Sequence, residues 1–273
     1  MSHSIPLAAV IGYPVAHSKS PRLHGHWLAR YGIAGHYVPL SIAPQDFSQA
    51  LAQLPRMGFV GANVTIPHKE AALALADRVS PLADRIGAAN TLVFPPDGIE
   101  ADNTDAYGFT QNIRATLPDW APNRVALIGA GGASRAVIVA LQDAGAQEIR
   151  LTNRTQDRAA DLAADFGPSV VPVPWSQRAS MLDGCDTLVN ATALGMTGQP
   201  PLDLDLTALP LSAVVNDLVY APLETPLLAA ARSRGNLGVD GLGMLLHQAA
   251  PGFERWFGTR PTVDDDLRRA VLA

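Results

Sequence analysis

The stretch Arg124–Arg158, RVALIGAGGASRAVIVALQDAGAQEIRLTNRTQDR, decides the fold of this chain. It opens with a continuous apolar run, Val125–Ile128, as expected of a strand buried on both faces. A glycine-rich turn, Gly129–Ser134, follows at once, and helical spacing runs from Arg135 to Ala144. A second strand is expected over Glu148–Thr152. This order predicts a βαβ unit that holds a dinucleotide.

The glycines of the turn have separate roles in the predicted site. Gly129 permits the tight turn, and Gly131 and Gly132 let the backbone approach a pyrophosphate. Free N–H groups and the positive end of the following helix would hold that group. Ser134 stands where the fingerprint has its final glycine, so we expect the helix to pack slightly farther from the strand. The loop residues expected to bind the cofactor are Gly129, Ala130, Gly131, Gly132 and Ala133.

The end of the second strand distinguishes two dinucleotides. An NAD site usually has an acidic residue there, which accepts hydrogen bonds from the ribose 2′-hydroxyl. This chain has Asn153, Arg154 and Thr155, and Arg158 follows. Both arginines can pair with a 2′-phosphate, and Thr155 can donate to it as well as cap the next helix. The alternative is a solvated helix start with Asp157 as a surface partner, but the pattern favours NADP as the cofactor.

The bulk composition is that of an ordinary soluble globular protein. The chain has 273 residues, 48% hydrophobic and 16% charged, with a net charge of −5. It has no basic tail, so it shows no electrostatic footprint for nucleic acid. Its one cysteine, Cys185, cannot form an internal disulfide, and no cysteine–histidine metal motif occurs. Met1–Pro6 lacks secretory features and no apolar run reaches the length of a membrane span, so we expect a cytoplasmic protein without membrane partners.

Apolar runs alternate with helix-period segments along the chain, which predicts an α/β fold with largely parallel sheets. The other expected strands cover 7–11, 37–42, 59–64, 91–94, 170–173, 187–190 and 213–218. Helices are expected from Pro21, around 47–54, over 69–79, before Pro118, after Thr225-Pro226, over 242–257 and after Thr262. Ser20 is expected to be the N-cap of the first, Gly258 to end the helix over 242–257, and Asp265 to complete a capping box in the last. Pro95–Gly98 is expected to form a turn.

Four polar clusters in the first half each follow an apolar strand. They are His17–Pro21, Asn63–Lys69, Gly87–Thr91 and Asp102–Asp105. Ligands of open α/β sheets bind outside the carboxyl ends of the strands, where these clusters would lie. They supply hydroxyls, amides, two lysines and acids, and offer no metal-binding geometry. Such a set suits a small, polyhydroxylated anion whose carboxylate Ser18 and Ser20 can hold.

Each of these side chains also has a purely structural interpretation. Ser20 and Asp105 could cap helices, Asn63 and Asn90 could brace turns, and Lys69 could be a solvated surface residue. Taken singly, these interpretations are at least as good as the functional ones. Because all the clusters occur in one chain with a dinucleotide motif, a ligand site is favoured.

With these motifs in place, nearly the whole chain resembles the shikimate dehydrogenase family. The resemblance rests on the four clusters, HSKSP, NVTIPHK, GAANT and DNTD, and on Gly129–Arg135, Asn153–Thr155, Asn190–Thr192, Asp217–Tyr220, and Gly241–Leu245 with Gln248. Their number and order make the match highly specific. Two positions depart from the family pattern: Gly25 stands where asparagine is often found, and Ala193 where serine is common.

The resemblance implies a two-domain α/β fold and a specific reaction, reversible reduction of 3-dehydroshikimate to shikimate by NADPH in the pathway to aromatic amino acids. Residues 1–105 and 241–273 would form a discontinuous substrate domain completed by the C-terminal helices, and 106–240 a Rossmann-type NADP-binding domain. Lys69 and Asp105 would be the catalytic pair. Substrate contacts would come from Ser18, Ser20, Thr65, Asn90, Tyr220 and Gln248, with Asn63 supporting the site, and Leu218 and Gly241 would join the cofactor set. A homodimer is one expectation for the oligomeric state.

The chemistry of the residues fits this reaction. Hydride transfer to a ketone builds negative charge on its oxygen, which a nearby ammonium such as that of Lys69 can stabilise and protonate. Two rival interpretations stay open. A quinate or dual quinate/shikimate dehydrogenase with NAD preference is disfavoured by Arg154 and by the small Ser18, and a non-catalytic sensor is disfavoured because both Lys69 and Asp105 are present.

Overall fold

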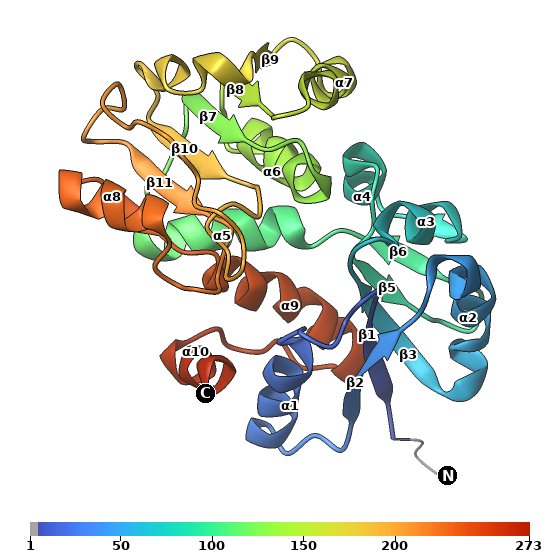
Figure 1. Ribbon diagram of the computed structural model, residues 1–273. Helices are drawn as coiled ribbons and strands as arrows, with labels where there is room; N and C mark the ends of the chain where they lie inside the picture. Colours follow the sequence, from blue (N-terminus) through green and yellow to red (C-terminus); the bar gives the residue numbers. More distant parts are fainter. Residues whose placement is uncertain (1–4) are drawn as a thin grey trace. The chain divides into compact units, whose positions relative to one another are not determined.

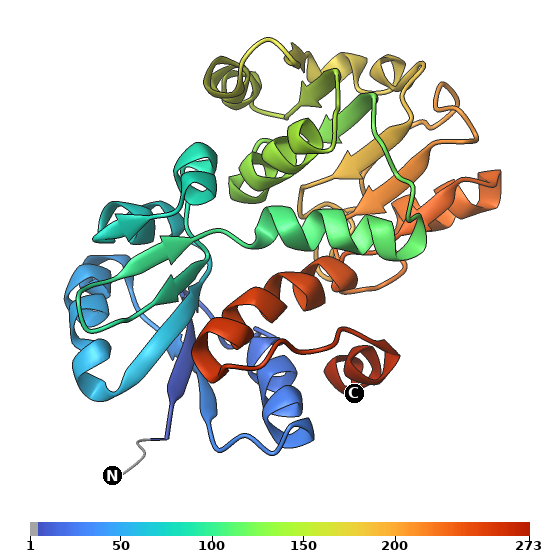
Figure 2. The same ribbon diagram turned by 180° about the vertical axis from the view of Figure 1, so that it is seen from behind.

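The computed structural model describes residues 5–273, and the chain forms two compact units, each visible in Figures 1 and 2. Unit 1 contains the chain up to Asp105 and Leu246–Ala273, whereas unit 2 contains Ala106–Leu245. The division falls at the start of α5 (Asp105–Thr116) and within α9 (Leu242–Phe257). Residues 1–4, on which part of the prediction about secretion rests, lie outside the described residues. Within the described chain, no helix is long and apolar enough to cross a membrane.

Unit 1 is built on a six-stranded mixed sheet in the order β2-β1-β3-β5-β6-β4. Its strands are β1 (Leu7–Gly12), β2 (His36–Ser41), β3 (Phe59–Val64), β4 (Arg78–Val79), β5 (Thr91–Val93) and β6 (Glu100–Asp102). β1, β2 and β3 are parallel, while β5 is antiparallel to both β3 and β6. Its helices are α1 (Ser20–Arg30), α2 (Phe47–Gln53), α3 (Lys69–Ala74), α4 (Pro81–Ile86) and α10 (Asp265–Leu272), with 3₁₀ turns at Pro44–Asp46 and Pro55–Met57.

The C-terminal helices complete the core of unit 1, as the resemblance implied. Trp27 of α1 and Phe253 of α9 are fully buried, with ring centroids 5.2 Å apart. The Trp27 indole also donates to the carbonyl of Thr262, 3.1 Å away, just before α10. On another part of the sheet, Phe47 of α2 packs with Leu92 of β5 in one apolar cluster. Residues more than 200 positions apart in sequence therefore share one core.

Three local predictions in unit 1 were wrong. The helix expected over 69–79 ends at Ala74, and β4 and β6 were not predicted. In that segment, Arg78 forms ion pairs with Asp97 and Glu100, so tertiary pairing at the edge of the sheet overrides the helical pattern. Ser20 is the first residue of α1 and not its N-cap. The capping box of Thr262 and Asp265 does not form at α10, because Asp264 is the N-cap and its side chain accepts the N–H of Leu267.

Unit 2 has a fully parallel six-stranded sheet in the order β12-β11-β10-β7-β8-β9. The strands are β7 (Arg124–Ile128), β8 (Glu148–Thr152), β9 (Val170–Val173), β10 (Thr187–Asn190), β11 (Val214–Asp217) and β12 (Leu237–Val239). The remaining helices are α6 (Gly132–Asp143), α7 (Gln156–Phe166) and α8 (Pro226–Arg234), with 3₁₀ turns at Trp175–Gln177 and Ser180–Leu182. The predicted α/β class with a Rossmann-type unit is confirmed.

The central strand β7 explains why its sequence is a continuous apolar run. Ala126 and Ile128 pack into a cluster with Leu227 and Leu228 of α8. Their neighbours Val125 and Leu127 are equally buried, so both faces of the strand are covered. The predicted cap of α8 is also confirmed, because the Thr225 hydroxyl accepts the N–H of Leu228. β7 lies between β8 and β10, and the strand order reverses there, which is where ligands of such sheets bind.

Candidate active site

Lys69 and Asp105 meet in unit 1 although they come from different elements. Lys69 begins α3 after β3, and Asp105 begins α5 after β6. The Lys69 Nζ donates to Asp105 Oδ2 over 2.5 Å, and the two side chains are 20% and 11% exposed. Lys69 is therefore not a solvated surface lysine. The pair is sheltered enough to hold one geometry, yet still reachable from solvent.

A second set of contacts fixes the Asp105 carboxylate. Asn90 Nδ2 donates to Asp105 Oδ1 over 2.8 Å, while Lys69 occupies the other oxygen. The Asp105 N–H donates to Asn103 Oδ1 over 3.0 Å, so the backbone at the helix start is also held. Both carboxylate oxygens are thus committed, and the Asp105 side chain has a single well-defined orientation toward Lys69.

Asn90 is the centre of this network. Its Oδ1 accepts the N–H of Thr104 at 2.8 Å and the hydroxyl of Thr91 at 2.9 Å. Its Nδ2 also lies 3.3 Å from Gln248 Oε1, which α9 brings into unit 1. The structure therefore brings together four residues that the sequence analysis assigned to the site: Lys69, Asn90, Asp105 and Gln248.

Asn63 lies behind this network and is buried. Its Nδ2 donates to the Asn90 carbonyl at 3.2 Å and to the Thr91 hydroxyl at 3.3 Å. Its Oδ1 accepts the hydroxyl of Tyr37 over 2.7 Å. His24 stacks on the Tyr37 ring with centroids 3.9 Å apart, and burial lowers the pKa of this histidine to about 3. The sequence analysis missed Tyr37 and His24; a buried tyrosine hydroxyl, which needs a partner, was the available signal.

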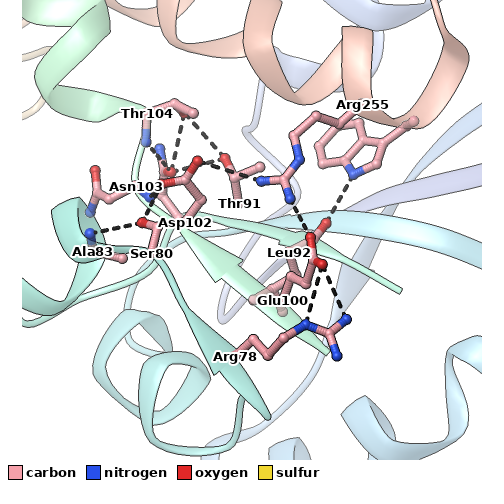
Figure 3. A network of polar contacts seen from close by, with 12 residues as sticks. Arg78, Ser80, Ala83, Thr91, Leu92, Glu100, Asp102, Asn103, Thr104 and Arg255 are labelled. Carbon is pink, nitrogen blue, oxygen red and sulfur yellow. Dashed lines mark hydrogen bonds and ion pairs between the residues drawn. The ribbon is translucent and has the colours of Figure 1, made fainter. Parts of the chain in front are cut away.

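The segment before Asp105 is held by a further set of polar contacts, shown in Figure 3. Asp102 Oδ1 accepts the Ser80 hydroxyl over 2.6 Å. Arg255 of α9 pairs with Glu100 at 2.5 Å and with Asp102 at 3.5 Å. The Trp256 indole donates to a carbonyl of β5 over 2.9 Å. These contacts anchor α9, the helix that carries Gln248, to the β5–β6 hairpin.

The other expected substrate residues of unit 1 lie after β1, at the start of α1 and after β3. Thr65 follows β3, and an added Cβ at Gly12 would come within 2.5 Å of its methyl group, so the loops after β1 and β3 run in close contact. The Ser18 hydroxyl accepts the N–H of Ser20 at 3.3 Å, and Ser20 is buried. In the described part of the chain, no hydrogen bond joins Ser18, Ser20 or Thr65 to Lys69.

In unit 2, the glycine turn has the shape that a dinucleotide requires. Gly129 has φ +109°, and a Cβ there would lie 2.8 Å from a methyl carbon of Thr192, so only glycine fits. At Gly131 and Gly132 an added Cβ would meet no atom within 4 Å. Protein packing does not require glycine at these two positions. The open space in front of them is what a closely approaching pyrophosphate needs.

Ser134 is hydrogen-bonded directly to the turn. It is fully buried; its hydroxyl donates to the Gly129 carbonyl over 2.7 Å and accepts the Gly131 N–H over 3.2 Å. The Ala130 N–H donates to Asn153 Oδ1 over 3.2 Å. The N–H groups of Ala130 and Gly131 therefore already have acceptors within the protein. The first turn of α6, which starts at Gly132, has N–H groups without acceptors in its own helix.

The residues after β8 fit an anionic ligand. Arg154, Thr155 and Arg158 are exposed, and Thr155 precedes α7 without a side-chain capping bond. Among residues 5–273, no carboxylate lies within ion-pair distance of either arginine, so Asp157 is not the surface partner that the alternative required. Asn153 donates to the Thr155 carbonyl over 2.8 Å and so links this segment to the glycine turn.

The remaining expected residues of unit 2 lie after β11. The Leu218 N–H donates to the Asn190 carbonyl over 2.9 Å. Gly241 packs its backbone against the Leu218 carbonyl too closely for a side chain. Tyr220 is partly exposed, and burial raises the pKa of its hydroxyl. Ala193, one of the departures from the family pattern, is exposed.

A Rossmann-type unit with unpaired arginines, in one chain with a lysine–carboxylate pair among amides and hydroxyls, defines a nicotinamide-dependent dehydrogenase of the two-domain α/β class. Three family models match the chain: the shikimate dehydrogenase substrate binding domain over residues 10–92, shikimate / quinate 5-dehydrogenase over 111–196, and the shikimate 5′-dehydrogenase C-terminal domain over 241–270. The chain belongs to the shikimate dehydrogenase family.

Individual relatives agree with this assignment. The shikimate dehydrogenase (NADP(+)) of Paracoccus denitrificans is 63% identical over 98% of this chain and 96% of its own length. Among solved structures, the quinate dehydrogenase of Corynebacterium glutamicum in complex with NAD has a TM-score of 0.92 at 33% identity, covering 98% of this chain and 99% of that one. The shikimate 5-dehydrogenase of Thermus thermophilus in complex with NADP(H) and shikimate has a TM-score of 0.88 at 36% identity, with the same coverage.

Proposed function

We propose that this chain catalyses the reversible, NADPH-dependent reduction of 3-dehydroshikimate to shikimate, a step on the way to aromatic amino acids. The observation that carries the proposal is the Lys69–Asp105 pair, held at 2.5 Å inside a network of amides and hydroxyls. Relatives at 58–63% identity that bear the name shikimate dehydrogenase (NADP(+)) support the same reaction and cofactor.

Lys69 is the proposed acid and base. When bound, NADPH would supply a hydride to the carbonyl carbon of the ketone, and negative charge would build on the ketone oxygen as the C=O π bond breaks. The Lys69 ammonium stabilises that charge and gives the oxygen its proton; in the reverse direction Lys69 takes the proton back. Asp105 keeps the ammonium in place through its Oδ2 and accepts a hydrogen bond from Asn90 at Oδ1.

The remaining polar groups are assigned to recognition of the substrate. Asn90 and Gln248 are bonded to each other and to the Asp105 segment, so they can present amide groups to ring hydroxyls without reorganising. Asn63 supports Asn90 from behind. Following the family resemblance, Ser18, Ser20, Thr65 and Tyr220 complete the set of substrate contacts.

The cofactor residues are assigned by the same reasoning. The open space at Gly131 and Gly132 and the first turn of α6 suit the pyrophosphate, and the unpaired Arg154 and Arg158 suit the 2′-phosphate. The full proposed set is Gly129, Ala130, Gly131, Gly132, Ala133, Asn153, Arg154, Thr155, Arg158, Leu218 and Gly241.

The second candidate is a quinate dehydrogenase that uses NAD. It is favoured by one observation, the TM-score of 0.92 to a quinate dehydrogenase in complex with NAD. A TM-score compares backbones only, and the shikimate 5-dehydrogenase of Thermus thermophilus has a similar TM-score of 0.88. The side chains that would select NAD are not the ones present, because Arg154 stands where an acidic residue would be expected.

Parallel assays of NADP⁺ and NAD⁺ reduction, each with shikimate and with quinate, test the proposal. We expect kcat/KM to be highest for shikimate with NADP⁺. Faster turnover of quinate with NAD⁺ would contradict it, and absence of turnover with all four pairs would favour the non-catalytic sensor. We also propose a cytoplasmic location and a homodimer, the latter to be tested by sedimentation.

A further inference from the structure

Asp217 is a buried carboxylate to which the proposed reaction assigns no role. It ends β11 and is fully buried. Its Oδ1 accepts Asn190 Nδ2 at 2.9 Å and the Val219 N–H at 3.0 Å, and its Oδ2 accepts the Thr225 hydroxyl at 2.6 Å. No cation lies within ion-pair distance of it among residues 5–273. A buried charge is costly unless several donors face it, so this arrangement needs a reason beyond packing.

The three donors come from three different segments. Asn190 ends β10 and, through its Oδ1, also accepts the Thr192 hydroxyl over 2.7 Å. Val219 lies in the loop after β11, and Thr225 is the N-cap of α8. A single carboxylate therefore ties the loop after β10, the loop after β11 and the start of α8 together at the carboxyl edge of the sheet.

Tyr220 lies between Val219 and Ala221, two residues whose backbones are held by hydrogen bonds. The Val219 N–H is held by Asp217, and the Val219 carbonyl accepts the Gly241 N–H at 3.2 Å. On the other side of Tyr220, the Ala221 carbonyl accepts the Thr197 N–H at 2.8 Å. Because Thr197 belongs to the segment that follows Asn190, a shift of either loop would move the Tyr220 backbone.

We propose that Asp217 is a positioning residue, which fixes the backbone that carries the Tyr220 side chain. The inference rests on the proposed function, in which Tyr220 contacts substrate. A carboxylate suits this position better than an amide, because both of its oxygens accept hydrogen bonds. The side chain of an asparagine would instead place its NH2 group against one of the N–H or O–H donors that the carboxylate accepts.

The chain offers a matched control for Asp217 in Asp186. Asp186 precedes β10 at the opposite, amino edge of the same sheet. Its carboxylate also accepts three neutral donors, the N–H groups of Asn123 and Arg124 and the Thr187 hydroxyl, each at 2.9 Å. Asp217→Asn and Asp186→Asn therefore remove the same kind of bonds at the two ends of one sheet, and only the first lies beside Tyr220.

The test compares steady-state kinetics of Asp217→Asn, Asp186→Asn, Tyr220→Phe and the double variant Asp217→Asn/Tyr220→Phe. We expect Asp217→Asn to raise the KM for shikimate about ten-fold with kcat changed less than about three-fold, and Asp186→Asn to leave the KM within about two-fold. If Asp217 acts through Tyr220, the double variant should have the KM of Tyr220→Phe alone.

Three results would overturn the proposal: a wild-type KM for Asp217→Asn, equal changes in Asp217→Asn and Asp186→Asn, or additive effects in the double variant. An unchanged KM for Tyr220→Phe would instead remove Tyr220 from the proposed substrate contacts, and the positioning role with it. If Asp217→Asn does not fold, Thr225→Val removes one of the three bonds. Its KM should rise while that of Thr225→Ser, which keeps the hydroxyl, should not; a wild-type KM for Thr225→Val would then count against the role.

Discussion

The two candidate ligand sites are built in opposite ways. In unit 1 the functional side chains are sheltered and bonded to one another: Lys69, Asp105, Asn90 and Gln248 form one connected set. In unit 2 the proposed cofactor site consists of backbone around an open turn, with arginines such as Arg154 exposed and without carboxylate partners among the described residues. The first site is organised before substrate arrives, whereas the second leaves its charged groups free for a ligand that carries its own charges.

This difference sets how each site should respond to mutation. Groups in a connected network are coupled, so removing one disturbs the positions of the others and effects are not additive. Exposed arginines that each contact a phosphate act more independently, and their loss should weaken binding without touching the chemistry. The first two predictions below exploit this contrast.

The largest effect is expected for Lys69→Ala. Removing the acid and base should lower kcat about 10³-fold while substrate affinity changes little, because the other polar contacts stay. Pre-steady-state and steady-state assays with shikimate and NADP⁺ measure both quantities. The control is Lys19→Ala, which removes the only other lysine, whose ammonium donates to the Val271 carbonyl at 3.1 Å. Near-wild-type turnover of Lys69→Ala would exclude Lys69 as the catalytic group.

A smaller, selective effect is expected for the exposed arginines. Arg154→Ala and Arg158→Ala should each raise the KM for NADP⁺ about ten-fold, since each loses a charge-assisted bond to the 2′-phosphate, and should leave the KM for NAD⁺ unchanged. Arg232→Ala, which removes a surface ion pair with Glu224, is the control. An equal rise in the KM values for NADP⁺ and NAD⁺ would mean that the arginines do not contact the 2′-phosphate. The proposed contrast between a connected substrate site and independent cofactor contacts would then be weaker.

The sequence predicted the two sites unequally well, for a physical reason. The Gly129–Ser134 turn and the strands around it are local features, and their apolar runs and glycines are visible in one stretch of chain. The partners of Asn90 were not predictable, because they depend on strand register: Asn63 stands opposite Thr91 only once β3 and β5 pair. The two-residue strand β4 had no pattern of its own and exists through its pairing with β6.

The third prediction concerns the stability of the core behind the unit 1 network. Burial lowers the pKa of His24 to about 3, and neither ring nitrogen has a hydrogen-bond partner within residues 5–273. Between this value and the ordinary 6.5, the unfolded chain binds a proton that the folded chain refuses, so stability falls as pH drops below 6.5. The loss attributable to His24 should reach about 2 kcal/mol at pH 5.

Urea unfolding of the wild type and of His24→Phe between pH 7.5 and 5 measures this contribution. His24→Phe keeps an aromatic ring against Tyr37, with centroids 3.9 Å apart in the wild type, and removes the titrating nitrogens. Its stability should therefore fall less steeply with decreasing pH, whereas His36→Phe, at an exposed position on β2, should keep the wild-type slope. Parallel slopes for wild type and His24→Phe would show that His24 titrates normally.

The smallest effect is expected at Gly25, the departure from the family pattern that lies within α1. Gly25 is exposed, and a Cβ there would meet no atom within 4 Å, so alanine adds no clash. Because alanine loses less backbone entropy in a helix, Gly25→Ala should raise the free energy of unfolding by about 0.5–1 kcal/mol. Activity should not change, since the substitution leaves every bond of the Lys69–Asp105 network in place. Thermal unfolding with parallel kinetics checks both points, and a loss of activity would show that the exposed face of α1 belongs to the site after all.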